Sequence, residues 1–273
     1  LYKAFGWDEP KWYHMPLLRN ADKTKISKRK NPVSLNYYKE EGYLKEGLLN
    51  FLALMGWSFG ENKEIFTIDE MIQNFSFDKI SLGGPVFDLV KLGWVNNHHM
   101  RLKDLDELTK LAIPYFVQAG YYENENLSDE EFSKLKRIVE ITREGSQTLK
   151  ELPVNASIYF EDEFELPVIE EGMNKKERKS IEKLTSSLET ETGKKSIQMF
   201  IEKINKLNEE ISEDEAKQIL HELQDEIGEG PAAVLMPLRA VITGKARGAD
   251  LYTVIAVIGK ERTLARINNI LNK

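Results

Sequence analysis

The residues best suited to chemistry lie in a short basic segment near the start of the chain, residues 25–29, with the sequence Lys-Ile-Ser-Lys-Arg. Two lysines held three positions apart, Lys25 and Lys28, suit a loop that gathers around nucleotide phosphates. There, their ammonium groups would offset the charge that builds up during phosphoryl or adenylyl transfer. A basic run of this length is also common on solvated surfaces and in localisation signals. Residues 19–24 before it and the long amphipathic stretch after it favour the catalytic interpretation.

The segments that must position these residues have the periodicity of helices. Apolar residues recur at intervals of three and four along most of the chain, so we predict a mainly α fold. Thr67 is a candidate helix cap. Strand signals are scarce, and residues 157–160 either pair briefly as a strand or form an exposed loop or helix start. The predicted helical stretches are residues 44–56, 67–75, 86–92, 102–118, 128–142, 175–188, 200–211, 216–227, 251–258 and 264–271.

The composition of the 273-residue chain is that of a soluble globular protein, with 41% hydrophobic and 30% charged residues. No apolar run approaches the roughly 20 residues of a membrane-spanning helix, so we expect no membrane association. The absence of cysteine excludes disulfides and thiolate metal sites and fits a reducing compartment, for which we expect the cytoplasm. Residues 1–7 include no initiator Met and do not resemble a signal peptide, so we expect the chain to begin within a longer protein.

Charge is unevenly distributed along the sequence. The net charge of -7 argues against indiscriminate binding of polyanions, and we expect no DNA partner. Both ends are nevertheless basic, and a basic cluster is the footprint expected of RNA contact. Arg239 and Arg262 have a structural alternative, because arginines beside helix ends often pair with a carboxylate or carbonyl. The candidate RNA-binding residues near the end of the chain are Arg239, Lys245, Arg247, Lys260, Arg262 and Arg266.

Taken together, these landmarks resemble the C-terminal half, or slightly more, of a bacterial-type glutamyl-tRNA synthetase. Residues 25–29 are similar to the KMSKS signature of class I aminoacyl-tRNA synthetases. The resemblance implies an elongated, multi-domain and mainly α assembly. It assigns residues 1–32 to the end of the catalytic domain, 33–95 to a stem-contacting helical domain, and 96–192 and 193–273 to two anticodon-binding subdomains. It is carried by residues 2–7, 14–17, 25–29, 38–44, 48–58, 87–88, 91–92, 94, 96, 101, 236–239, 243–244, 248 and 259–262.

The resemblance also implies an activity for the parent enzyme, which would join glutamate to ATP, with Mg²⁺, and pass the glutamyl group to its tRNA. Lys28 matches the second lysine of the motif and Lys25 the first, as catalytic residues that neutralise ATP phosphates. Ser27 and Arg29 complete the phosphate-contacting loop. The His-x-Gly-His element of the family is absent from the sequence, so we expect this chain alone to bind tRNA without activating glutamate.

The sequence departs from the family pattern at two places. Lys30-Asn31 stands where His-Gly is common, and Ala246-Arg247 replaces a small polar residue and His, so fine specificity toward glutamate or glutamine tRNA is not carried over. A stand-alone helical RNA-binding or protein-interaction module would explain the helices equally well.

The four histidines occupy unrelated positions, or adjacent ones that cannot share a helix face, so we predict no metal site in this chain.

Overall fold

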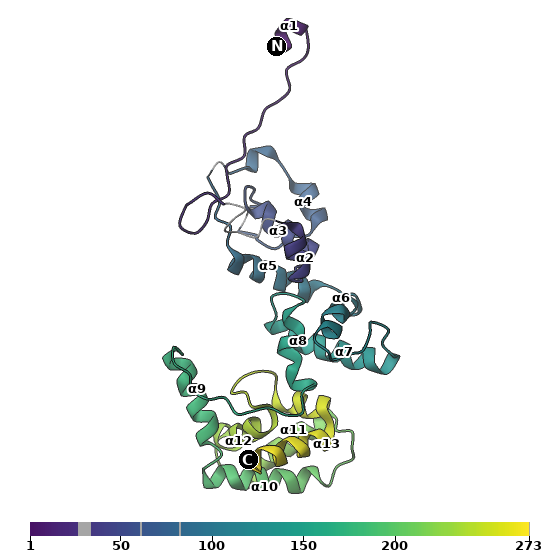
Figure 1. Cartoon of the computed structure of the whole chain (residues 1–273), viewed down its shortest axis with the longest axis vertical. Helices are drawn as coiled ribbons and strands as arrows, with labels where there is room; N and C mark the ends of the chain where they lie inside the picture. Colours follow the sequence, from purple (N-terminus) through teal and green to yellow (C-terminus); the bar gives the residue numbers. More distant parts are fainter. Residues whose placement is uncertain (27–33, 61, 82, 273) are drawn as a thin grey trace. The chain divides into compact units, whose positions relative to one another are not determined.

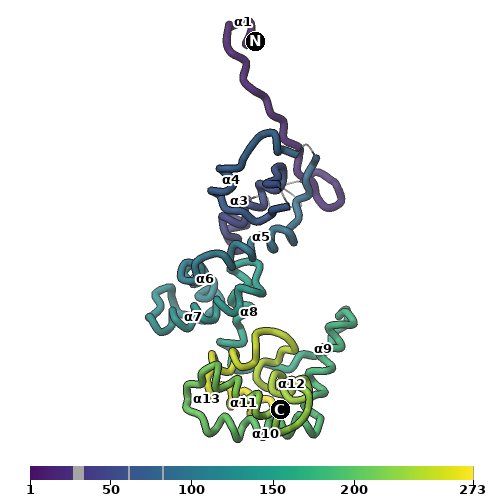
Figure 2. The backbone as a smooth tube through the Cα atoms, turned by 180° about the vertical axis from the view of Figure 1, so that it is seen from behind, coloured from purple at the N-terminus to yellow at the C-terminus, as the bar shows by residue number. Residues whose placement is uncertain are grey.

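The computed structural model describes residues 1–26, 34–60, 62–81 and 83–272, in which helices are the main regular element and long connections join them (Figures 1 and 2). Within these ranges the backbone forms thirteen α-helices and no β-strand, only three isolated bridges. The predicted mainly α fold is confirmed. None of the helices in the described ranges is long and apolar enough to cross a membrane. The chain divides into a first unit, residues 1–125 with 143–153, and a second unit, residues 126–142 with 154–273.

The first unit is built around the packing of α3 on α5. Tyr38 of α2 joins Phe51 of α3 and Leu92 and Val95 of α5 in a buried core. Burial of each such side chain stabilises the unit by about 1.5–3 kcal/mol. The helical elements are α1 (Tyr2–Phe5), α2 (Leu35–Glu40), α3 (Lys45–Leu54), α4 (Ile68–Asn74), η1 (Phe77–Lys79), α5 (Leu89–Leu102), α6 (Leu105–Gln118), η2 (Arg143–Gly145) and the first residues of α8 (Glu151–Ala156).

A buried amide, that of Asn96 in α5, ties three segments of the first unit together. Its Oδ1 accepts a hydrogen bond of 2.8 Å from the backbone N–H of Leu44, which caps α3, and its Nδ2 donates one of 2.6 Å to the carbonyl of Gln147. Gly47 allows this approach, because a Cβ there would lie 2.4 Å from Asn96 Oδ1. The side chain therefore satisfies two backbone groups that are remote from it in sequence.

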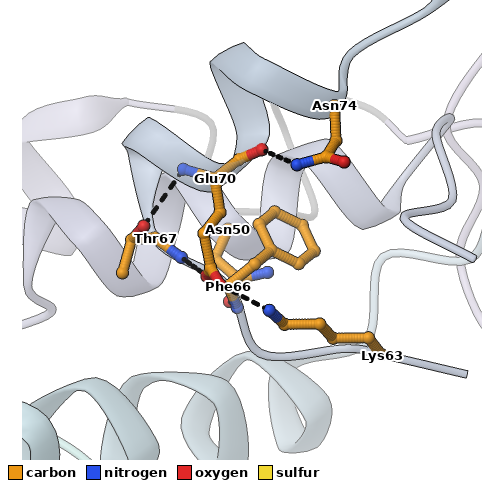
Figure 3. Close-up of polar contacts among 6 residues, drawn as sticks. All are labelled: Asn50, Lys63, Phe66, Thr67, Glu70 and Asn74. Carbon is orange, nitrogen blue, oxygen red and sulfur yellow. Dashed lines mark hydrogen bonds and ion pairs between the residues drawn. The ribbon is translucent and has the colours of Figure 1, made fainter.

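A second buried amide, that of Asn50 in α3, hydrogen-bonds the residues just before α4 (Figure 3). Its Nδ2 donates to the carbonyl of Glu64 at 2.9 Å, and its Oδ1 accepts from the N–H of Phe66 at 3.1 Å. His99 Nε2 lies 2.9 Å from the same Oδ1, so this ring nitrogen carries the proton. Burial lowers the pKa of His99, which favours the neutral imidazole that this contact uses.

The start of α4 matches the helix predicted from sequence. Thr67 Oγ1 accepts from the N–H of Glu70 at 3.1 Å, and Glu70 Oε2 accepts from the N–H of Thr67 at 2.9 Å, which forms a capping box (Figure 3). Lys63 Nζ lies 2.6 Å from Glu70 Oε1, and Asn74 Nδ2 donates to the Glu70 carbonyl at 2.8 Å. Local sequence alone is sufficient to place this helix.

The second unit packs its helices pairwise. Helix α10 contacts α11 and α12, α13 contacts α11 and α12, and α9 contacts α12. Phe200, Leu223, Val234 and Ile267 are among its buried side chains. The helical elements are α7 (Asp129–Thr142), the last residues of α8, η3 (Ser157–Tyr159), α9 (Lys175–Ser186), α10 (Glu191–Ile204), α11 (Glu213–Ile227), α12 (Pro231–Thr243) and α13 (Leu251–Leu271).

Several predicted boundaries were wrong. Helix α5 starts at Leu89, where Asp88 caps it, and it runs on to Leu102, so the helix predicted from 102 begins instead at Leu105 behind the cap Asp104. The segment left open at 157–160 contains the 3-10 turn η3. Helix α10 begins ahead of the predicted start at 200, because the side chain of Thr190 caps it.

Helix α13 is interrupted at Gly259, which has φ 77° and ψ 176°. This interruption agrees with the predicted division into residues 251–258 and a last helix. Positive φ is readily adopted by glycine and costly for other residues. The break directs the N–H of Lys260 to the carbonyl of Glu209 at 3.3 Å, and Lys260 Nζ donates to the carbonyl of Leu207 at 2.8 Å. The middle of α13 thereby holds the connection between α10 and α11.

Candidate functional site

The segment that leads into the basic loop is held on both sides by backbone hydrogen bonds. Arg19 N–H donates to the carbonyl of Pro85, and Phe87 N–H donates to the carbonyl of Arg19, both at 2.9 Å. On its other side Arg19 forms an antiparallel bridge with Lys25. Gly84 lies close beside it, since a Cβ there would lie 2.6 Å from Nε of the Arg19 side chain. The extended backbone at Arg19 is thus hydrogen-bonded to residues 85–87, which lead into α5.

A tight turn joins Arg19 to Lys25. Asn20 N–H donates to the carbonyl of Thr24 at 2.8 Å, and Lys23 N–H donates back to the carbonyl of Asn20 at 2.9 Å. Asp22 Oδ1 accepts from the N–H of Thr24 at 2.9 Å and from its Oγ1 at 2.5 Å. Asp and Asn favour such turns because their side chains can bond nearby backbone. Lys25, the residue that follows this turn, is exposed.

The remaining residues of the predicted phosphate-contacting loop, Ser27, Lys28 and Arg29, lie outside the described residues, so their assigned roles stay predictions. Both flanks of the loop are anchored. Ile26 N–H donates to the carbonyl of Leu18 at 3.3 Å, and Ser34 caps α2 by accepting from the N–H of Asn36 at 3.3 Å. These hydrogen bonds fix the described residues on either side of residues 27–33.

Two of the six candidate RNA-binding residues cap or cross-link elements of the second unit. Arg239 Nη2 donates to the carbonyl of Ala249 at 2.8 Å, and burial lowers the pKa of this arginine. Lys260 Nζ donates to the carbonyls of Leu207 and, at 3.2 Å, Asn205, which lie at the end of α10. Arg239 and Lys260 therefore both donate to backbone carbonyls. Such pairing is the structural alternative to RNA contact that was given for Arg239.

Arg262 and Arg266 are also engaged within the second unit. Arg262 Nε lies 2.5 Å from Asp162 Oδ1, and its Nη1 donates to the carbonyl of Tyr159 at 2.8 Å. Arg266 is 1% exposed and donates to the carbonyls of Ile242, at 3.1 Å, and Glu161. Burial lowers the pKa of Arg266 to about 10. Arg266 therefore presents no donor at the surface that an RNA could reach.

The other two candidates, Lys245 and Arg247, lie exposed in the connection between α12 and α13. Lys245 Nζ is 3.4 Å from Ser157 Oγ, whereas Arg247 has no hydrogen bond or ion pair with any described residue. Gly244 ends α12 with φ 63°, and a Cβ there would lie 2.5 Å from the ring of Phe164. The close turn therefore presents Arg247 to solvent. Lys245 is exposed as a residue, but burial lowers the pKa of its ammonium group.

A further exposed basic face, on α9, was missed by the analysis of charge along the sequence. Four lysines of this helix, Lys175, Lys176, Lys179 and Lys183, are exposed. Three of them recur at intervals of four, a spacing that places them along one side of a helix. That spacing was the signal that could have found them, because the helix itself was predicted.

Comparison with known proteins identifies the family. The model of the anticodon binding domain matches residues 107–271, and the model of the catalytic domain of class I tRNA synthetases (E and Q) matches residues 1–94. A glutamate–tRNA ligase from Fusobacterium nucleatum is 61% identical over 274 residues, which cover 100% of this chain and 54% of that protein. The chain belongs to the glutamate–tRNA ligase family.

Other members of the glutamate–tRNA ligase family agree with this assignment. A ligase from Thermus thermophilus is 40% identical over 99% of this chain and 53% of its own length. The crystal structure of a glutamate tRNA ligase from Elizabethkingia meningosepticum in complex with its amino acid matches with a TM-score of 0.76 and 29% identity, covering 100% of this chain and 53% of that one. The chain spans about half the length of the curated relatives it matches.

Proposed function

We propose that this chain supplies the tRNA-binding part, and the phosphate-contacting lysine loop, of a glutamate–tRNA ligase that acts in the cytoplasm. The observation that carries the proposal is the 61% identity to the Fusobacterium nucleatum ligase across the whole chain. The partners of the whole protein are glutamate, ATP and a glutamate-accepting tRNA, with no role for DNA or a membrane. The predicted division at residues 32, 95 and 192 stays part of this proposal.

The proposed reaction has two steps. A carboxylate oxygen of glutamate attacks the α-phosphorus of ATP, the bond to the bridging oxygen breaks, and pyrophosphate leaves. A ribose hydroxyl at the 3′ end of the tRNA then attacks the glutamyl carbonyl and releases AMP. Lys28 and Lys25 act in the first step, because their ammonium groups offset the charge that accumulates on the triphosphate oxygens. Ser27 and Arg29 shape the loop and its field.

Mg²⁺ is expected to accompany ATP in the whole enzyme. Among the residues that the structure describes, no group of three or more His, Asp or Glu side chains could hold a metal ion. By itself the 273-residue polypeptide is proposed to bind tRNA without activating glutamate.

The proposal is tested by the selectivity of RNA binding. We expect the 273-residue chain to bind a glutamate-accepting tRNA transcript at least about tenfold more tightly than a random RNA of equal length, measured over a series of salt concentrations. A generic helical scaffold would hold both RNAs through phosphates alone and would not discriminate. Equal affinities at every salt concentration would therefore favour the stand-alone module and contradict the proposal.

The exposed turn between α12 and α13 is the proposed RNA contact that is best supported by geometry. We expect Arg247→Glu to weaken tRNA binding roughly tenfold, because it reverses a charge that no described residue neutralises. Lys206→Glu is the matched control, since it makes the same change of charge at another exposed residue of the second unit. Fluorescence anisotropy with labelled tRNA measures both variants, and an equal loss in the two would remove Arg247 from the contact set.

A further inference from the structure

Helix α9 carries a concentration of positive charge in an otherwise acidic chain. Its twelve residues include Lys175, Lys176, Arg178, Lys179 and Lys183 but only two acidic residues, whereas the whole chain has a net charge of -7. Among the described residues, none of the four lysine side chains takes part in a hydrogen bond or an ion pair. This helix face is therefore a patch of positive charge whose lysines form no ion pair with any described residue.

Helix α9 packs on its unit near its C-terminal end, whereas its N-terminal end is exposed. Leu184, near its C-terminal end, is fully buried, and α9 contacts α12. Residues 174–179 are all exposed. In both views of the second unit α9 projects from the bundle formed by α10 to α13 (Figures 1 and 2). Lys175, Lys176 and Lys179 therefore lie on a part of the helix that packs against nothing in its own unit.

The lysines oppose the stability of the helix that carries them. Like charges four residues apart repel each other, and cations in the first turn oppose the helix dipole. Asn174 and Glu177 compensate locally through a capping box, in which Glu177 Oε2 accepts from the N–H of Asn174 at 3.0 Å. Because Glu177 is committed to the cap, it does not pair with the lysines. A polyanion bound along the helix would relieve this repulsion.

We propose that the α9 lysine face, consisting of Lys175, Lys176, Lys179 and Lys183, binds the phosphate backbone of the tRNA. The inference rests on the proposed function and deepens it by adding a second RNA-contacting surface. Lys175, Lys179 and Lys183, four residues apart, are spaced about 6 Å along the axis, so their flexible stems can reach consecutive phosphates of one strand, and Lys176 lies beside the first of them. Contacts of this kind position the RNA and do not depend on its sequence.

The test is a triple variant, Lys175→Gln, Lys176→Gln and Lys179→Gln, in the 273-residue chain, with a glutamate-accepting tRNA transcript as the probe. We expect a loss of affinity of roughly tenfold or more, and a salt slope of the binding constant that is shallower by about two to three, since each phosphate contact contributes about 0.7–0.9. The control variant carries Lys110→Gln, Lys134→Gln and Lys206→Gln, which remove the same charge at exposed lysines outside α9.

Circular dichroism and thermal melting separate weaker binding from unfolding. The triple variant should keep its helix content and melt no lower than the unmodified chain, because the substitutions remove repulsion. Unchanged affinity and salt slope would overturn the inference, and so would an equal loss in the control variant. If the unmodified chain fails to prefer glutamate tRNA over random RNA but still binds both through α9, the proposed function fails while the α9 surface stands.

Discussion

Replacing Lys28 with Ala in a full-length ligase containing this chain is expected to lower the rate of glutamate activation by roughly 100- to 1,000-fold. The lost ammonium group would no longer offset charge on the triphosphate as pyrophosphate departs. Because that charge is largest in the transition state, kcat should fall more than the KM for ATP changes. Affinity for tRNA should stay within about twofold, since the anticodon-binding surfaces are untouched. ATP–pyrophosphate exchange and aminoacylation measure the two steps separately.

Lys39→Ala is the matched control for this experiment. Lys39 is an exposed lysine of α2, close in sequence to the loop, so its removal makes the same change of charge without touching the motif. The rate of ATP–pyrophosphate exchange by the Lys39→Ala enzyme should stay near that of the unmodified enzyme. Full activity of the Lys28→Ala enzyme would contradict the proposed role of the loop and, with it, the first step of the mechanism.

Asn96→Leu is expected to destabilise the first unit by roughly 2–5 kcal/mol. The substitution leaves the N–H of the buried Leu44 without the partner that Asn96 supplies, and it removes the hydrogen bond to the carbonyl of Gln147, an exposed residue. A buried group left unpaired costs about 1–3 kcal/mol, and a lost hydrogen bond adds about 0.5–1.5 kcal/mol. The four tryptophans, Trp7, Trp12, Trp57 and Trp94, all belong to the first unit, so tryptophan fluorescence during urea unfolding reports on that unit alone.

The control for this measurement is Asn74→Ala, which removes an exposed amide whose single bond is to the carbonyl of Glu70 in the same helix. Its effect on the free energy of unfolding should stay below about 1 kcal/mol. If Asn96→Leu proved no more damaging than this control, the buried amide could not be the tie between the three segments that the geometry describes.

Sequence patterns predict the structural features that depend on residues close together in the sequence. The cap at Thr67 and the apolar stripes of α3 and α11 involve residues a few positions apart, so their spacing alone indicates a helix. The amides of Asn50 and Asn96 escaped prediction because their partners include residues about 50 positions away, and nothing local marks an asparagine as buried.

The candidate RNA surface illustrates the same limit. Arg247 and Arg266 are the same residue type in the same basic cluster, yet one is exposed in a turn and the other is enclosed among backbone carbonyls. Charge along the sequence predicts that cations gather near the end of the chain, but only packing decides which of them faces solvent. The α9 lysines were overlooked for the opposite reason, since their exposure follows from a helix end that packs on nothing in its own unit.

The interruption of α13 at Gly259 links two parts of the second unit that are distant in sequence. An uninterrupted helix would consume the N–H of Lys260 internally, whereas here it secures the residues between α10 and α11. Insertions into that connection are consequently not free to vary as ordinary surface loops are. Lengthening or shortening it in an engineered protein would require redesigning the middle of the last helix at the same time.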